Sequence, residues 1–303
     1  MGTGKDCMTV SGEARVTLED GRHLDIYRSG PEDARVLLFH HGTPGSRAPF
    51  RDIENAAHRH GFQLVTLSRP GYGSSTRQPG RSVADVVADT VQVLDAVGAD
   101  RCVVAGWSGG GPHALACGAR LAGRVDGVLV MAGVGPYGFE DLDFMNGMGE
   151  GNIVEFGKAI EGEAALRPFL EEEREQMLQA TPSQLVEAMG SLLPPVDKAQ
   201  LTGELGEDLM ANFHEALRLG VDGWLDDDLA FARPWGFDLS EVSVPTFLWQ
   251  GSEDLMVPFD HGQWLAEQIP GVTAHLEPGE GHVSVVIGAL DRMFSELAGV
   301  TCS

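Results

Sequence analysis

Apolar residues gather in short runs that recur along the chain, and most of these runs end in glycine. Continuous apolar runs are typical of strands buried on both faces of a sheet. Near the N-terminus, residues 13–20 and 22–30 instead alternate apolar and polar positions around Asp20-Gly21, a strong turn signal. We therefore predict an N-terminal hairpin followed by buried strands within 34–42, 62–71, 100–109, 125–135, 244–254 and 272–277.

Stretches with helical spacing separate these runs. The clearest covers residues 82–98, where Ser82 and Asp85 have the spacing of a capping box and Gly98 follows the last apolar position. Buried strands that alternate with helices predict an α/β fold, with a mostly parallel sheet covered by helices on both faces.

The alternation stops between residues 137 and 236. This stretch has no convincing buried strand, is rich in acidic residues, and contains amphipathic helical patterns such as 164–180 and 207–220. We predict one α/β core made of residues 1–136 and 237–303. Residues 137–236 would be a helical cap, inserted between two strands and lying over the sheet as a lid.

Composition and charge narrow the classes of partner. The 303 residues include 21 basic and 45 acidic residues, a net charge of −24, which argues against nucleic acid and gives no attraction to anionic lipid. No run approaches the roughly 18 uncharged apolar residues of a membrane helix. Residues 1–20 lack the apolar segment of a signal peptide, and the four cysteines are scattered without a C-x-x-C pair. We expect a cytoplasmic protein with a small-molecule partner, and the sequence leaves homo-oligomerisation open.

Ser108 stands at a sharp corner between a predicted buried strand and a predicted helix. Residues 106–110, GWSGG, match G-x-S-x-G in the strand–turn–helix context that gives this motif its meaning. A nucleophile at such a turn has a strained backbone, and its neighbours must lack Cβ atoms so that strand and helix can approach. Since ligands of open α/β sheets bind at the carboxyl ends of strands, we predict Ser108 as a nucleophile.

A serine hydroxyl needs a base to take its proton. His282 follows the last short strand and precedes a C-terminal helix, so we predict it as that base. Asp254 follows the preceding buried run and would orient the imidazole. The chain order Ser, Asp, His is the order expected for this architecture.

Five segments in this order resemble the α/β-hydrolase fold superfamily over nearly the whole chain, and within it the proline-iminopeptidase-like and lipase-like bacterial hydrolases. The segments are HHGTPGS (40–46), SRPGYGSS (68–75), GWSGGG (106–111), GSEDLMVP (251–258) and GEGH (279–282). The resemblance implies that Asp254, rather than Glu253, is the acid, and that the backbone N–H groups of Thr43 and Gly109 form an oxyanion hole. Peptidase members usually read His-Gly-Gly-Pro-Gly where this chain has Thr43, and many relatives carry Asp at the position of Ser68.

The remaining histidines and the aromatic residues have simpler interpretations. His40 and His41 are expected to shape the oxyanion loop rather than bind metal, because no partner lies at ligand spacing. His113 is expected to pack, and His214 and His261 to lie on the surface or in the cap. As residues of the substrate pocket we predict His41, Trp107, Trp224 and Met256, with ordinary packing as the alternative.

These observations predict a serine hydrolase without cofactor or metal that cleaves a carboxylic ester, lactone or amide through an acyl-enzyme. Two alternatives stay open. One is a proline-iminopeptidase-like aminopeptidase, and the other is a lyase or ligand-binding protein that retains the triad.

Overall fold

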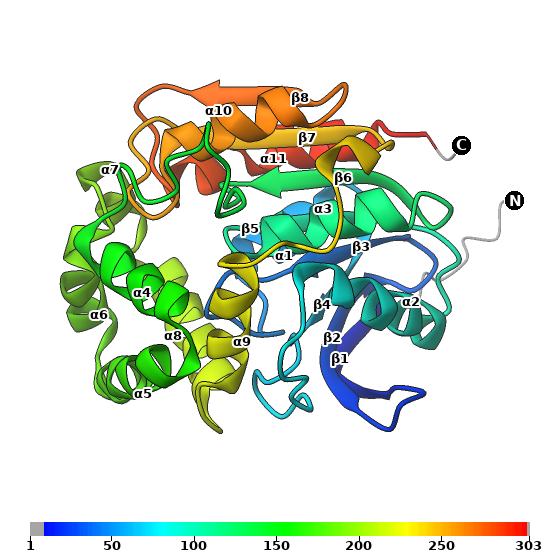
Figure 1. Ribbon diagram of the computed structural model, residues 1–303. Coiled ribbons are helices and arrows are strands. Elements are labelled where there is room, and N and C mark those ends of the chain that lie inside the picture. The colour runs from blue at the N-terminus through cyan, green and yellow to red at the C-terminus, as the bar shows by residue number, and fades with distance from the viewer. Residues whose placement is uncertain (1–8, 302–303) are drawn as a thin grey trace, which may run out of the picture.

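The buried runs form one sheet of eight strands, in the order β1-β2-β4-β3-β5-β6-β7-β8, in the computed structural model, which describes residues 9–301 (Figure 1). The β1–β2 and β2–β4 pairs are antiparallel and the other pairs are parallel. The predicted hairpin and mostly parallel sheet are therefore confirmed. The strands are β1 (Thr9–Thr17), β2 (His23–Pro31), β3 (Arg35–His40), β4 (Phe62–Leu67), β5 (Cys102–Trp107), β6 (Val125–Met131), β7 (Thr246–Gly251) and β8 (Thr273–Glu277).

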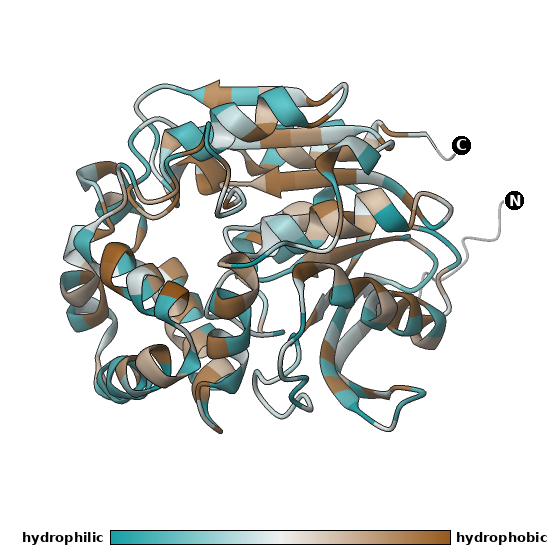
Figure 2. Ribbon diagram, in the orientation of Figure 1, coloured by the Kyte–Doolittle hydropathy of each residue, from teal (hydrophilic) through white to brown (hydrophobic). Residues whose placement is uncertain are grey.

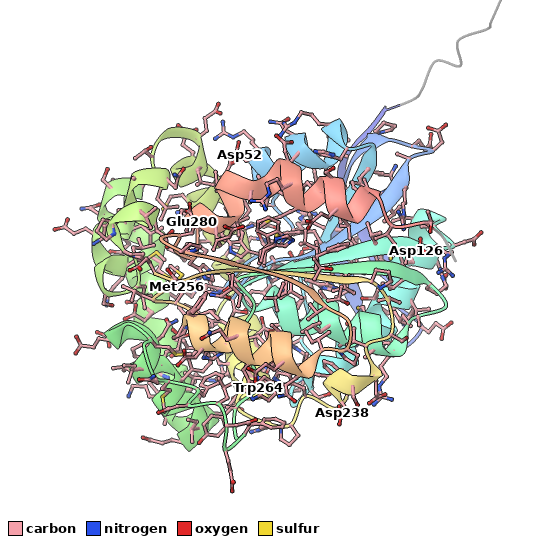
Figure 3. All side chains as sticks on the ribbon, turned by 90° about the horizontal axis from the view of Figure 1, so that it is seen from above. Asp52, Asp126, Asp238, Met256, Trp264 and Glu280 are labelled. Carbon is pink, nitrogen blue, oxygen red and sulfur yellow. The ribbon has the colours of Figure 1, made fainter. Side chains whose placement is uncertain are left out.

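Helices cover both faces of the sheet, as Figure 3 shows from above. On one face, α1 (Arg51–Arg59) and α11 (Ser284–Ala298) pack against β3, β5 and β6. The opposite face is covered by α2 (Val86–Val97), α3 (Gly110–Arg120) and α10 (Phe259–Gln268), with the short turns η1 (Val83–Asp85) and η3 (Leu239–Glu241). Two apolar cores therefore hold the central strands between them.

The central strands are apolar throughout because both of their faces are covered. Every residue of β5 and β6 is buried, and β6 is coloured as hydrophobic along most of its length in Figure 2. Polar runs in this position would leave unpaired groups in the core. Helix α2 ends at Gly98, whose positive φ of 74° closes the last turn at low steric cost.

Between β6 and β7 the described chain contains no strand, and apart from η3 its helices form one set. They lie beyond the carboxyl ends of the parallel strands, on the left of Figure 1. The set consists of α4 (Glu150–Glu161), α5 (Glu163–Gln179), α6 (Pro182–Ala188), η2 (Met189–Ser191), α7 (Pro195–Gln200), α8 (Gly203–Leu217) and α9 (Asp222–Phe231).

His261 differs from its sequence prediction. His261 is buried in the core rather than placed at the surface, because its ring joins two loop segments. Nδ1 accepts the N–H of Gly135 at 2.9 Å, and Nε2 lies 2.8 Å from the carbonyl oxygen of Phe144, to which it donates. A buried imidazole is tolerated here because both nitrogens are bonded.

Cysteines and membrane spans can be compared with their predictions only in part. Cys102 and Cys117 are buried free thiols, whereas Cys7, Cys302 and the first eight residues of the predicted leader-free N-terminus lie outside the described residues. Within residues 9–301, no helix is both long and apolar enough to cross a membrane.

Candidate active site

Ser108 occupies a strained turn between β5 and α3. Its φ of 56° lies in the left-handed region that residues with a Cβ rarely adopt. Glycines make the turn sterically feasible, because a Cβ on Gly106 would lie 2.1 Å from the carbonyl oxygen of Gly110. A Cβ on Gly110 would in turn lie 2.1 Å from the carbonyl oxygen of His40. The local sequence therefore fixes the position of Ser108 at the carboxyl edge of the sheet.

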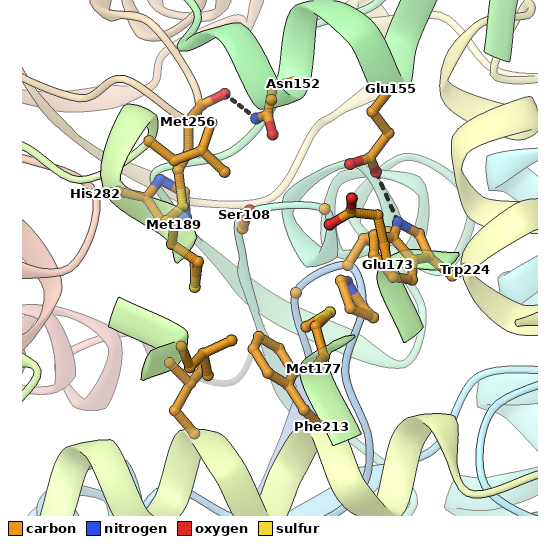
Figure 4. A pocket seen from close by; sticks show the side chains of 18 of the residues that line it. Ser108, Asn152, Glu155, Glu173, Met177, Met189, Phe213, Trp224, Met256 and His282 are labelled. Carbon is orange, nitrogen blue, oxygen red and sulfur yellow. Dashed lines mark hydrogen bonds between the residues drawn. The ribbon is translucent and has the colours of Figure 1, made fainter. Parts of the chain in front are cut away.

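A cavity of about 530 Å³ lies between this edge and the helices α4–α9. Ser108 and His282 both line it, and Figure 4 shows their side chains beside the same space. The two residues are 174 positions apart along the chain, and the parallel sheet brings their loops to one edge. No hydrogen bond joins Ser108 to His282 within the described residues, and in catalytic sites such contacts are often long in the absence of substrate.

His282 is held by Asp254. The imidazole Nδ1 donates to Asp254 Oδ2 at 2.8 Å, and both side chains are buried. Asp254 Oδ1 accepts the N–H groups of Met256 and Val257, each at 2.8 Å, and Gln250 donates to Oδ2 at 3.0 Å. The position of the Asp254 carboxylate is thus fixed. Because this carboxylate accepts a hydrogen bond from Nδ1, the neutral imidazole carries its proton on Nδ1, and Nε2 is the basic nitrogen.

The charge on Asp254 also affects the pKa of His282. Burial disfavours the imidazolium, but the charge and hydrogen bond of Asp254, together with the charge of Asp197, raise the pKa of His282 above its ordinary value of 6.5. Trp107 stacks beside the ring, with centroids 6.0 Å apart. The arrangement can accept a proton near neutral pH and stabilise it afterwards.

Thr43 and Gly109 approach each other closely beside Ser108. A Cβ on Gly109 would lie 2.4 Å from Thr43 Oγ1, and both residues line the cavity. Among residues 9–301, no protein group accepts a hydrogen bond from the backbone N–H of either residue. Two free N–H groups next to a serine hydroxyl can bind an oxyanion.

The predicted pocket residues divide into two sets. Trp107, Trp224 and Met256 line the cavity, but His41 does not. His41 is buried behind it, where its Nδ1 lies 2.7 Å from the carbonyl oxygen of Gly42 and its Nε2 accepts the N–H of Arg69 at 3.2 Å. The placement of His41 in the pocket was wrong because its ring is used to shape the loop that precedes Thr43.

Sequence reasoning did not identify Asp227, the centre of a buried network on α9. Its carboxylate accepts hydrogen bonds from Arg69 and Arg81, both at 2.6 Å, and from Tyr72 and Thr43, both at 2.8 Å. Burial disfavours the charged carboxylate, but the two arginines hold the pKa of Asp227 well below its ordinary range. Asp227 therefore ties α9 to the loop that carries Thr43.

The charge of Arg69 also lowers the pKa values of two neighbouring histidines, His40 and His113. Burial and then the charge of Arg69 lower the pKa of His40 to about 3 and that of His113 well below its usual value. Both rings are therefore neutral in the folded protein at neutral pH. Within the described part of the chain, no group of three or more His, Cys, Asp or Glu side chains has the arrangement of a metal site.

Comparisons with known proteins point to one family. A family model described as "alpha/beta hydrolase fold" matches residues 35–289. The 2-hydroxy-6-oxononadienedioate/2-hydroxy-6-oxononatrienedioate hydrolase of Burkholderia vietnamiensis is 25% identical over 276 residues, covering 88% of this chain and 87% of that protein.

Solved structures have the same fold. A hydrolase from Pseudomonas aeruginosa superposes with a TM-score of 0.69 at 18% identity, over 95% of this chain and 98% of that one. An esterase from Exiguobacterium antarcticum gives a TM-score of 0.66 at 16% identity, over 94% and 98% of the two chains.

Proposed function

The chain belongs to the alpha/beta hydrolase fold family, and on that premise we propose that it is a serine hydrolase of a small carboxylic ester, lactone or amide. The observation that carries the proposal is a single juxtaposition. Ser108, strained at φ 56°, lines the same cavity as His282, whose imidazole is hydrogen-bonded to Asp254. Relatives named as hydrolases and esterases support the general reaction class.

The proposed reaction begins with acylation. Ser108 Oγ forms a bond to the substrate carbonyl carbon while its proton moves to His282 Nε2. The N–H groups of Thr43 and Gly109 stabilise the oxyanion, a contribution of roughly 100- to 1,000-fold in rate for one such donor. The C–O bond to the alcohol then breaks, and His282 returns the proton to the leaving oxygen.

Deacylation uses the same groups with water as nucleophile. His282 Nε2 takes a proton from water as its oxygen attacks the acyl carbon. Collapse of the second tetrahedral intermediate breaks the bond to Ser108 Oγ, which recovers the proton from His282. The products are one carboxylic acid and one alcohol, and Asp254 remains ionised throughout.

We further propose that residues 137–236 act as a cap that closes the acyl pocket. The cavity is lined mostly by apolar side chains, many of them from α4, α5, α6, α8 and α9, including Phe156, Leu185, Phe213 and Phe231. An apolar pocket of this size accommodates a small acyl or alcohol group and excludes water from the acyl-enzyme.

Turnover of p-nitrophenyl butyrate tests the proposal, with Ser108→Ala as the matched variant. We expect hydrolysis by the wild type and loss of at least about 1,000-fold in kcat for Ser108→Ala. A fluorophosphonate probe should add its mass to the wild-type protein and not to the variant. Unchanged turnover in Ser108→Ala would refute the assignment. A labelled protein that releases no acid from any ester, lactone or amide would indicate the lyase or binding alternative.

A further inference from the structure

The Gly42–Thr43 peptide is hydrogen-bonded at its carbonyl end by two side chains. The N–H end of this peptide, on Thr43, is one of the two proposed oxyanion donors. The peptide lies beside the nucleophile, because a Cβ on Gly42 would be 3.5 Å from Ser108 Cβ. The carbonyl oxygen of Gly42 accepts Arg69 Nη2 at 2.9 Å and His41 Nδ1 at 2.7 Å. The proposed reaction uses the N–H end and assigns no part to the donors at the carbonyl end.

The guanidinium of Arg69 is held in one orientation by its other contacts. The side chain is buried, and Nη1 donates to the carbonyl oxygen of His41 at 2.5 Å. Nη2 also donates to Thr43 Oγ1 at 3.1 Å, and Nε and Nη2 donate to Asp227 Oδ2 at 3.1 and 2.6 Å. Because the donors of a guanidinium form a rigid planar fork, these contacts fix the direction in which Arg69 meets the Gly42 oxygen.

His41 donates to the same oxygen as a neutral ring. Burial and then the charge of Arg69 lower the pKa of His41 well below its usual value. Nε2 accepts the backbone N–H of Arg69 at 3.2 Å, so the single proton of the ring is on Nδ1, which donates to Gly42. Arg69 therefore acts on the Gly42 oxygen directly through its guanidinium and also fixes the proton of the second donor.

Asp227 balances only part of the positive charge behind this peptide. Arg69 and Arg81 share its single carboxylate, each at 2.6 Å. All three side chains are buried, and together they carry one positive charge. Buried charges are screened less than exposed ones. The carbonyl end of the Gly42–Thr43 peptide thus faces positive charge, and its N–H end lies where the reaction develops negative charge.

Hydrogen bonds at one end of a peptide strengthen the hydrogen bond at the other end. A donor on the carbonyl oxygen draws electron density from the amide nitrogen, and hydrogen bonds linked in this way gain roughly 10–30% per bond. A charged donor forms a bond about twice as strong as a neutral one. The Thr43 N–H therefore binds an oxyanion more strongly than an isolated peptide would, and the gain is largest in the transition state, where the charge appears.

We propose that Arg69 is a positioning residue of the oxyanion hole, which together with His41 polarises the Gly42–Thr43 peptide and strengthens the Thr43 N–H toward the transition state. The inference rests on the proposed function, because it gives Arg69 a part in the reaction of Ser108. It is separate from the anchoring of α9 by Asp227, since that contact needs no donor on the Gly42 oxygen.

Arg77 provides a matched control for Arg69. It also follows β4 along the chain and binds the neighbouring carboxylate of α9, because its Nε and Nη2 donate to Asp226 at 2.8 Å each. Within the described residues the hydrogen bonds of Arg77 go to Asp226, and none reaches Gly42. Arg69→Lys and Arg77→Lys each keep a positive charge for α9 and lose the planar fork. If both arginines only held α9, the two variants would behave alike.

Two measurements separate polarisation of the peptide from support of the fold. The first is kcat and KM for p-nitrophenyl butyrate. The second is the affinity of butylboronic acid, in which Ser108 Oγ bonds to boron, the hydroxyl proton moves to His282 and the boron becomes a tetrahedral anion. Ser108→Ala, which cannot form this bond, gives the baseline.

We expect Arg69→Lys to lower kcat by about tenfold or more while KM changes less than about threefold. The affinity of butylboronic acid should fall by about the same factor as kcat, because the tetrahedral anion needs the same N–H donor. Arg77→Lys should change each of the three values by less than about threefold.

A pair of His41 variants tests the same carbonyl contact without altering Arg69. His41→Asn places an amide nitrogen close to the position of Nδ1, whereas His41→Leu has a similar shape and no donor. Both variants lose Nε2. We expect kcat and the affinity of butylboronic acid to be about three- to tenfold higher in His41→Asn than in His41→Leu.

Equal kcat in Arg69→Lys and Arg77→Lys would overturn the proposal, and so would a loss of kcat that leaves the affinity of butylboronic acid unchanged. If Arg69→Lys does not fold, equal values in His41→Asn and His41→Leu would overturn it. A wild-type protein that binds butylboronic acid through Ser108 but hydrolyses no ester, lactone or amide would refute the proposed function, and the boronic acid affinities would still test the polarisation.

Discussion

Asp197 Oδ2 accepts the backbone N–H of His282 at 2.7 Å. The other oxygen of the same carboxylate accepts the N–H groups of Val283 and Ser284, at 3.0 and 2.8 Å. Asp197 lies on α7, so a residue of the helical segment caps the first turn of α11 and fixes the peptide that carries the proposed base. Gly281 permits this approach, because a Cβ there would be 2.4 Å from the carboxylate.

Replacing Asp197 by Asn is expected to shift the pH dependence of catalysis. The proposed base is active when neutral, so kcat/KM falls as pH drops through the pKa of His282. The Asp197 charge helps to raise that pKa against the effect of burial, so Asp197→Asn should lower the pKa and move the acid limb to lower pH. Initial rates with p-nitrophenyl butyrate across pH measure this shift.

Asp143→Asn, which removes an exposed carboxylate from the same inserted segment, serves as the control and should leave the limb in place. A purely structural contribution of Asp197 would reduce the rate without moving the limb. If the acid limb of the kcat/KM profile stays at the same pH in Asp197→Asn, Asp197 does not raise the pKa of His282 through its charge.

Loss of the Asp227 charge should destabilise the fold strongly. Asp227→Asn leaves Arg69 and Arg81 buried beside a neutral group, and breaking a fully buried ion pair typically costs about 3–5 kcal/mol. Urea unfolding measures the free energy, with Asp143→Asn again as the exposed control. A decrease of less than about 1 kcal/mol in the free energy of unfolding would show that the hydrogen-bond network around Asp227 does not anchor α9.

A methyl group at Gly106 should disrupt the turn that holds Ser108. Its Cβ would lie 2.1 Å from a backbone oxygen, so Gly106→Ala must displace α3 or β5, and we expect a loss of more than about 2 kcal/mol. Gly123→Ala is the matched control, because nothing lies within 4 Å of a Cβ at that exposed position. Thermal unfolding and fluorophosphonate labelling measure both effects, and a fully labelled, equally stable Gly106→Ala would refute this account of the turn.

Glu155 should make stability depend on pH. Burial raises its pKa from 4.5 to about 7, so the folded state binds more protons than the unfolded state between these values. The contribution is therefore complete below about pH 4.5 and is lost as pH rises through about 7, in total on the order of 3 kcal/mol. Glu155→Gln should make this decline smaller, and the raised pKa of neighbouring Asp228 accounts for the part that remains.

Urea unfolding at several pH values measures the difference between wild type and variant. The control is Glu171→Gln, whose curve should run parallel to that of the wild type because its carboxylate is exposed. If the Glu155→Gln and wild-type curves run parallel as well, Glu155 is ionised at its ordinary pKa in the folded protein.

Local signals in the sequence were sufficient for the sheet and for the turn at Ser108. Continuous apolar runs require burial on both faces, and the Gly-x-Ser-x-Gly spacing is a steric requirement of one strand–helix junction. The position of Asp254 after a buried strand and of His282 after the next predicted their meeting, because parallel strands end at one edge of the sheet.

The tertiary structure alone decided the roles of the remaining polar residues. Asp226, Asp227 and Asp228 are three consecutive aspartates, yet their surroundings differ because successive helical positions point about 100° apart. Asp226 pairs with Arg77, Asp227 pairs with Arg69 and Arg81, and Asp228 lines the cavity. The places of two histidines likewise depend on hydrogen-bond partners far away in the sequence. His41 holds the loop before Thr43 by accepting the N–H of Arg69, and His261 is held in the core by the N–H of Gly135. The partner of a buried charge depends on which segments pack together, and no local pattern specifies that.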